Sequence, residues 1–160
     1  MNSRGGRGLI AVDKMGGKVL FLDPDSYATT HILDDFERLP HELLVPPQSP
    51  TAYVPIYGDG IHGRNPNPGH LLSVIDLETR RHVTDIDLSP YVAPHGLQIG
   101  PDGLLYITCE NSGVVALVDL AKNTVVGAIE TGSVNSHRLV IAQAVEPGRP
   151  ADRSFCSDRP

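Results

Sequence analysis

The sequence predicts an all-β fold built by repeating one unit of four short strands. Sixteen glycines and fourteen prolines among 160 residues imply many turns, which favours short strands over long helices. The apolar residues fall in short runs rich in β-branched side chains, as is typical of strands. A single pattern of residues also recurs three times along the chain. With 40% hydrophobic residues, the chain is long and apolar enough to bury a core.

The recurring pattern is an apolar run that ends in Asp, a polar turn, a second strand-like run, and a His followed two residues later by Leu. The Asp-terminated runs are 19–23, 72–76 and 115–119, the second runs are 30–33, 82–88 and 124–129, and the histidines are His41, His95 and His137. Equivalent Asp residues are 53 and 43 positions apart, and equivalent His residues are 54 and 42 apart. The longer middle copy predicts a loop at 57–69, where Gly and Pro are too frequent for a strand.

The clearest copy begins at 94–108, which reads as a strand, a tight turn and a second strand. Pro101, Asp102 and Gly103 are the residue types that such a turn requires. From the innermost outward, the strands of this copy are predicted at 97–100, 104–109, 114–119 and 124–130. A repeat of about 42 residues with four strands is typical of a propeller blade, whereas a helical solenoid would need longer amphipathic runs. We therefore expect a partial β-propeller of about three four-stranded antiparallel blades.

This copy also resembles a known repeat family. The stretch Leu105-Tyr106-Ile107-Thr108-Cys109, continued by 110–119 and 123–126, resembles the YVTN β-propeller repeat, with Tyr-Ile-Thr where the family has Tyr-Val-Thr. Pro94-His95-Gly96 is similar to the start of blades in streptogramin lyases and lactonase-like propellers. The third copy matches best and the first most loosely. The resemblance implies a propeller fold, and it leaves the activity open.

The repeat pattern covers residues 8–142, and we expect the Pro- and Arg-rich remainder, 143–160, to be a disordered tail. Three blades do not close a ring, since propellers have about four to eight. The pattern starts on a second strand and stops after an innermost one, which would leave strand edges unpaired. We therefore expect either a piece of a longer propeller or a homodimer whose halves complete a six-bladed ring.

Charge and composition exclude some classes of partner. A net charge of −6 and the lack of a basic run argue against nucleic acid. No stretch approaches the roughly 18 apolar residues of a membrane helix, so we expect no membrane insertion. The first eight residues lack the apolar core of a signal peptide, which favours the cytoplasm by default, although the resembling family is often exported. Cys109 and Cys156 do not define a disulfide framework and are expected to be a buried strand thiol and a tail thiol.

The candidate functional residues are those that strand polarity places on one face. They are His41, His95, His137, Asp59, His62, Glu110, Asn111, Asp13 and Lys14. Imidazoles from neighbouring blades would converge on the channel axis, where a carboxylate such as Glu110 could complete a divalent-metal site. Alternatively, a neutral imidazole, with His95 the candidate, could act as a general base. The structural alternative is that each repeat His only caps nearby backbone, and that His62 is a solvated loop residue.

Other acidic residues are interpreted structurally. Asp23, Asp76 and Asp119 each begin a turn and are expected to accept hydrogen bonds from the backbone two or three residues later. Glu37, His41 and Glu42 are close in sequence, but strand alternation would send neighbours to opposite faces, so no cluster is predicted there.

Two functions fit these observations. The first is a YVTN-like binding or interaction scaffold that receives a small molecule or a protein at the channel mouth. The second is a metal-dependent lactonase or lyase that uses His41, His95 and His137 as ligands or bases.

Overall fold

A computed structural model describes residues 8–142 as eleven strands in three antiparallel sheets, with one 3-10 turn. The predicted tail at 143–160, which includes Cys156, lies outside the described residues. The strands of the first sheet are β1 (Leu9–Asp13), β2 (Lys18–Leu22) and β3 (Thr29–Leu33). Those of the second are β4 (Leu39–Pro40), β5 (Thr51–Gly58), β6 (Pro68–Asp76) and β7 (Arg81–Asp87). Those of the third are β8 (Pro94–Ile99), β9 (Leu105–Cys109), β10 (Val114–Asp119) and β11 (Thr124–Glu130), with the 3-10 turn η1 (Glu110–Ser112) after β9.

The third sheet has the predicted four strands in the predicted order, β8 to β11, each antiparallel to its neighbour. The expected turn joins β8 to β9, where the Gly103 N–H donates to the carbonyl of Gly100 at 3.0 Å. Gly103 has a φ of 81°, a conformation that a side chain would strain. The residues that predicted the turn therefore form it.

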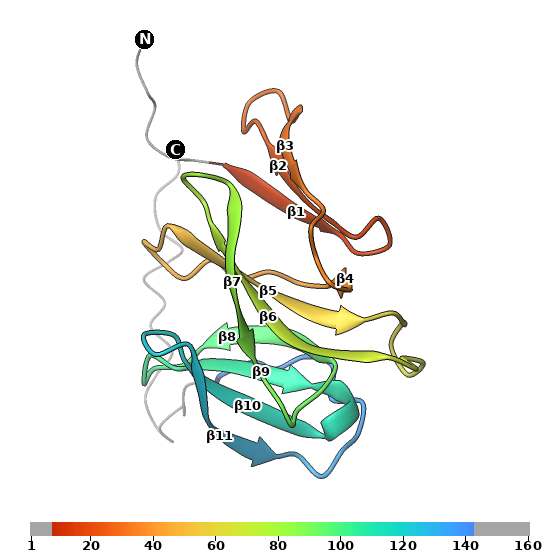
Figure 1. Ribbon diagram of the computed structural model, residues 1–160. Coiled ribbons are helices and arrows are strands. Elements are labelled where there is room, and N and C mark those ends of the chain that lie inside the picture. The colour runs from red at the N-terminus through yellow and green to blue at the C-terminus, as the bar shows by residue number, and fades with distance from the viewer. Residues whose placement is uncertain (1–7, 143–160) are drawn as a thin grey trace, which may run out of the picture.

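The three sheets follow one another in space in chain order, as Figure 1 shows. Apolar side chains fill both spaces between them. The core between the first two sheets contains Val19, Phe21, Leu33, Ala52, Val54 and Ile75. The core between the second and third contains Tyr53, Leu72, Val74, Ile86, Leu88, Leu105, Ile107 and Val118. Each blade buries a face against the next, which is how a propeller is stabilised. Since the middle blade is covered on both faces, β5 is buried at nearly every position.

The long loop of the middle blade is shorter than predicted. Tyr57 and Gly58 belong to β5, while Pro68 and Gly69 belong to β6, so the loop spans 59–67. Gly58 adopts a φ of 122° where the register of the two strands shifts. A Cβ on Gly69 would overlap the Ile56 carbonyl oxygen. Glycine therefore extends the hairpin here by permitting a bulge and a close backbone approach.

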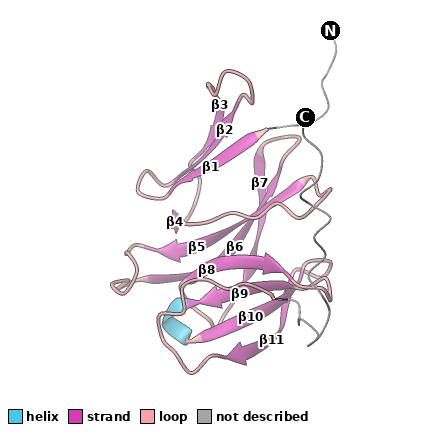
Figure 2. Cartoon of the chain, turned by 180° about the vertical axis from the view of Figure 1, so that it is seen from behind, coloured by secondary structure: helices cyan, strands magenta, loops and turns pink. Residues whose placement is uncertain are grey.

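The innermost strand predicted after the third blade is not formed in the described residues. The segment 131–142 contains no strand, and Figure 2 shows the chain continuing after β11 as loop. No second strand of a further blade pairs with it among residues 8–142. Instead, the Ile141 N–H donates to the Gln98 side chain at 3.0 Å. The first sheet has three strands, as expected for a pattern that starts on a second strand.

Candidate metal centre

The three repeat histidines meet at one end of the inner strands. His41 directly follows β4, His95 is the second residue of β8, and His137 lies in the segment after β11. The His95 ring is sandwiched between the other two, with ring centroids 3.8 Å from His41 and 3.7 Å from His137. The outer two rings are 6.4 Å apart. Consecutive repeats thus contribute their imidazoles to one cluster, in which neighbouring rings are tilted by 47° and 46°.

The inner imidazoles have polar atoms without partners. His95 is fully buried, and neither of its ring nitrogens makes a hydrogen bond within the described structure; the same holds for Nδ1 of His41. The expectation that these histidines only cap backbone is therefore wrong for His95. Burial, followed by the charge of neighbouring histidines, lowers the pKa of His95 to about 3. Burial and the Lys14 charge lower the pKa of His41 to about 4. Both rings are neutral at pH 7 and retain lone pairs for a ligand.

His137 is held in place by the start of the third blade. The Gly96 N–H donates to Thr108 Oγ1 at 2.8 Å, and that hydroxyl donates to the carbonyl of His137 at 3.1 Å. A Cβ on Gly96 would lie 3.1 Å from the same carbonyl oxygen, so glycine allows the segment to approach. The Asn135 N–H donates to the backbone carbonyl of Glu110 at 2.8 Å. The Pro-His-Gly pattern therefore supplies one imidazole and helps to position another.

Glu110 is a buried carboxylate at the start of η1, where the chain leaves β9. Its Oε2 accepts a hydrogen bond from the Tyr57 hydroxyl at 3.0 Å, and its Oε1 accepts one from the Gly63 N–H at 2.9 Å. Burial raises the pKa of Glu110, but the hydrogen bonds from Gly63, His62 and Tyr57 outweigh it and lower the pKa below its ordinary value. Glu110 is therefore ionised at neutral pH.

His62 contacts this cluster although its side chain is partly exposed to solvent. Its side chain is 51% exposed, yet its Nδ1 lies 3.0 Å from Glu110 Oε2 and 3.1 Å from Nδ1 of His137. Asn65 shapes the loop that carries it, because its amide accepts from the Gly60 N–H and donates to the Tyr57 carbonyl. The expectation of a merely solvated loop histidine is wrong.

Three of these atoms are spaced as ligands of one metal ion. Glu110 Oε2 and Nδ1 of His137 are 3.9 Å apart, and His62 Nδ1 lies between them at 3.0 and 3.1 Å. A point about 2.0 Å from all three atoms lies in the plane that they define, so small side-chain shifts that shorten the 3.9 Å separation would bring them to the tetrahedral arrangement that Zn²⁺ prefers. A hydrogen on Nδ1 of His62 can be donated to only one of its two neighbours at a time, whereas a cation could bind all three donor atoms.

A second group of donors consists of His41, Glu42 and His95, whose ligand atoms all lie within 4.8 Å of one another. Glu42 Oε1 is 3.6 Å from His95 Nδ1. The prediction that His41 and Glu42 would point apart is wrong, because β4 ends at Pro40 and the strand alternation stops there. Glu37, in contrast, only approaches Arg38 at 3.8 Å on the surface.

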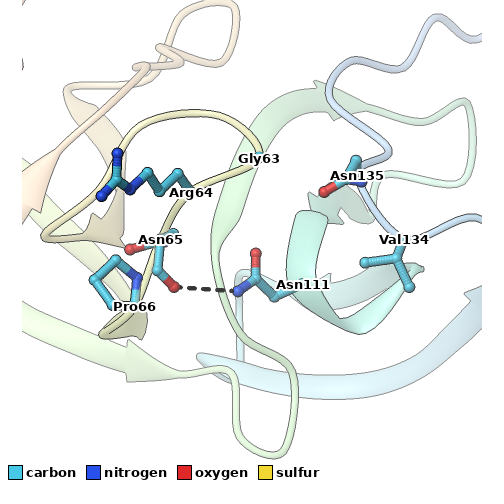
Figure 3. A pocket seen from close by; sticks show the side chains of 7 residues that line it. All are labelled: Gly63, Arg64, Asn65, Pro66, Asn111, Val134 and Asn135. Atoms are coloured by element: carbon cyan, nitrogen blue, oxygen red, sulfur yellow. Dashed lines mark hydrogen bonds between the residues drawn. The ribbon is translucent and has the colours of Figure 1, made fainter.

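The remaining residues of the predicted face lie around the cluster. Asp59 is paired with Arg38 at 3.0 Å, and Asp13 accepts a hydrogen bond within its own turn. Lys14 Nζ lies 4.1 Å from the centre of the Tyr57 ring. Asn111 lines a cavity of about 490 Å³ beside the 59–67 loop, and its amide points to the carbonyl of Asn65 at 3.5 Å (Figure 3).

Asp23, Asp76 and Asp119 have the predicted structural role. Each accepts hydrogen bonds from backbone N–H groups two or three residues later. These bonds, together with bonds from side chains in the same turns, lower the pKa of all three carboxyls. Their recurrence therefore reflects a repeated turn and not a binding site.

The fold and the comparisons define this chain as a partial β-propeller. No family model matches the sequence, and no curated protein matches it. Among solved structures, the chain is similar to hydrazine synthase of Kuenenia stuttgartiensis, a protein that contains a β-propeller. The match has a TM-score of 0.66 at 20% identity and covers 83% of this chain and 35% of that one. The chain thus spans about a third of that protein chain, and the likeness concerns the fold. Within the described residues, no helix has the length and apolarity needed to cross a membrane.

Proposed function

We propose that this chain forms part of a β-propeller binding protein that holds a divalent transition-metal ion on His62, Glu110 and His137. The spacing of the three donor atoms around one point carries this proposal. Two imidazoles and one carboxylate favour Zn²⁺, Co²⁺, Ni²⁺ or Fe²⁺ over Mg²⁺ and Ca²⁺, which prefer oxygen ligands.

The site is open on one side. The side chains of His62 and His137 are 51% and 45% exposed, while Glu110 is fully buried. Three protein ligands leave a position for water or for an oxygen of a small molecule at the channel mouth. We therefore propose that the metal recognises a ligand there, in keeping with a binding function.

A second candidate is a metal-assisted lactonase or lyase, and the open coordination position favours it. A metal at this position would polarise a carbonyl group of the substrate. His95, which is neutral, fully buried and 3.7 Å from His137 between ring centroids, is the candidate base. Under this second function His95→Ala abolishes lactone hydrolysis, whereas a binding protein shows no such activity to lose.

Metal titration tests the proposal. Zn²⁺ affinity of the 160-residue chain is measured by competition with a chromophoric chelator, for the wild type and for His62→Gln and Glu110→Gln. We expect each variant to weaken binding by about 100-fold or more, since each removes a ligand. His31→Gln is the matched control, because in the described part of the chain His31 also has an unpaired ring nitrogen but belongs to neither donor group. Zn²⁺ binding that is unchanged in both affinity and stoichiometry in the two ligand variants would refute the site.

The six-bladed homodimer and the division at residue 142 remain proposals. They are supported by the three blades and by the loss of the repeat pattern after that residue. The mass measured by light scattering checks the dimer: a particle of twice 17.2 kDa supports it and a monomer refutes it.

A further inference from the structure

We propose that the same cluster binds a second divalent transition-metal ion, on His41, Glu42 and His95. This site shares no residue with the first, so it is independent of the function proposed above. It would make the channel mouth a two-metal centre, in which the three repeat histidines contribute His137 to the first donor set and His41 and His95 to the second.

The unpartnered nitrogens of the inner rings are the first reason. His95 is fully buried, and both of its ring nitrogens lack hydrogen-bond partners among residues 8–142, as does Nδ1 of His41. Buried polar groups in native proteins are nearly always paired, so an unpaired group needs an explanation. A cation between the two rings and a carboxylate would use one lone pair from each ring.

The chemistry of the donors is the second reason. Glu42 Oε1 is already 3.6 Å from His95 Nδ1, and all donors of the set lie within 4.8 Å of one another. Because Glu42 is a quarter exposed, its side chain is the member that can rotate toward the rings. Two imidazoles and a carboxylate again favour Zn²⁺ or Co²⁺ over Ca²⁺.

Positive charges near this second site oppose the cation. Arg138 Nη2 lies 3.6 Å from Glu42 Oε1, and Lys14 contributes charge close to His41. Arg138 is 72% exposed, so its removal leaves the core intact. Arg138→Gln is therefore expected to tighten the second binding step by about threefold to tenfold.

The test counts bound ions. The chain is equilibrated with Zn²⁺ at a buffered free concentration, desalted and analysed for metal, and Co²⁺ absorption reports the coordination of each ion. We expect two equivalents in the wild type and in His31→Gln, and one equivalent in Glu42→Gln, in His95→Gln and in His62→Gln. Glu42→Gln is the decisive variant, because its partly exposed side chain can change without disturbing the core, as far-UV circular dichroism will show.

The outcomes separate the two sites. If the wild type binds one equivalent of Zn²⁺ that His62→Gln loses and Glu42→Gln keeps, the second site is overturned and the first is retained. If the wild type binds one equivalent of Zn²⁺ that Glu42→Gln loses and His62→Gln keeps, the second site is supported and the first is overturned. Two equivalents that persist in both Glu42→Gln and His95→Gln also overturn the second site.

Discussion

The hydrogen bond from Tyr57 to Glu110 allows a sharp test of how this cluster is held together. Tyr57 is fully buried at the end of β5, and its hydroxyl donates to Glu110 Oε2 at 3.0 Å. Tyr57→Phe removes only the hydroxyl and keeps the ring that packs beside His41 at a centroid distance of 5.2 Å. Glu110 then keeps its contacts with Gly63 and His62 but loses one of its donors.

A buried hydrogen bond to a charged group contributes about 1.5–3 kcal/mol, so we expect Tyr57→Phe to lower the free energy of unfolding by about 2 kcal/mol. With an m-value of about 2 kcal/mol/M, the urea midpoint would fall by about 1 M. The pKa of Glu110 in the folded chain is below its ordinary value of 4.5. Its stabilising contribution is therefore complete above pH 4.5 and is lost as the pH falls through the folded pKa, so the difference between the two proteins should shrink in acid.

Tyr106→Phe is the matched control, because the Tyr106 hydroxyl donates to Asp102 Oδ2 at 2.9 Å on the surface. Urea unfolding at pH 7 is followed by circular dichroism for the wild type and both variants. We expect Tyr106→Phe to shift the midpoint little, since water replaces an exposed hydrogen bond at small cost. A Tyr57→Phe shift no larger than that of Tyr106→Phe would show that burial does not strengthen this bond and would refute the reasoning.

Three further predictions concern the fold. Gly69→Ala is expected to lower the free energy of unfolding in urea by about 1–3 kcal/mol or more, because the added Cβ overlaps the Ile56 carbonyl. Gly127→Ala is the control and should be near neutral, since its Cβ meets only an ordinary contact. Equal losses of stability in the two variants would contradict this prediction. Asp76 has a pKa below its ordinary value of 3.8, so its contribution is complete above that value and is lost as the pH falls through the folded pKa. Acid titration should therefore destabilise the wild type more than Asp76→Asn, and parallel curves would count against it. Burial raises the pKa of Cys109 to about 12, so its thiol should be unreactive in the folded chain. In a Cys156→Ser background, iodoacetamide should therefore label Cys109 only after unfolding. Rapid labelling of the native chain would contradict the burial of Cys109.

Local chemistry explains why the strands and turns could be predicted. The Pro101-Asp102-Gly103 turn and the Asp turns at 23, 76 and 119 each depend on residues within three positions of one another. The repeat added long-range information, because three copies of one pattern imply three similar sheets packed in sequence. The polarity of the strands then placed the repeat histidines at the same end, which is where they lie.

The composition of the cluster could not be predicted in the same way. Glu42 can face His95 because β4 ends at Pro40. If the strand had continued through His41 and Glu42, its alternation would have placed these two side chains on opposite faces. Whether His62 reaches Glu110 depends on the bulge at Gly58 and on the Asn65 bonds within the loop. Both are boundary effects in which a shift of one or two residues changes the facing side chain. Tyr57 was missed for the same reason, since it looked like part of the loop but belongs to β5.

The cluster also explains why a propeller-like arrangement suits this chemistry. Each donor group draws its members from different sheets: Glu42 precedes β5 while His95 starts β8, and His62 follows β5 while Glu110 follows β9. The core between the second and third sheets fixes the distances across these pairs, so the donors meet without being neighbours in the chain. A rigid packing of this kind positions side chains whose mutual repulsion or desolvation would otherwise drive them apart. Within residues 8–142, the packing of the blades then maintains the buried, unpaired nitrogens of His95, and a bound cation would give one of them a partner.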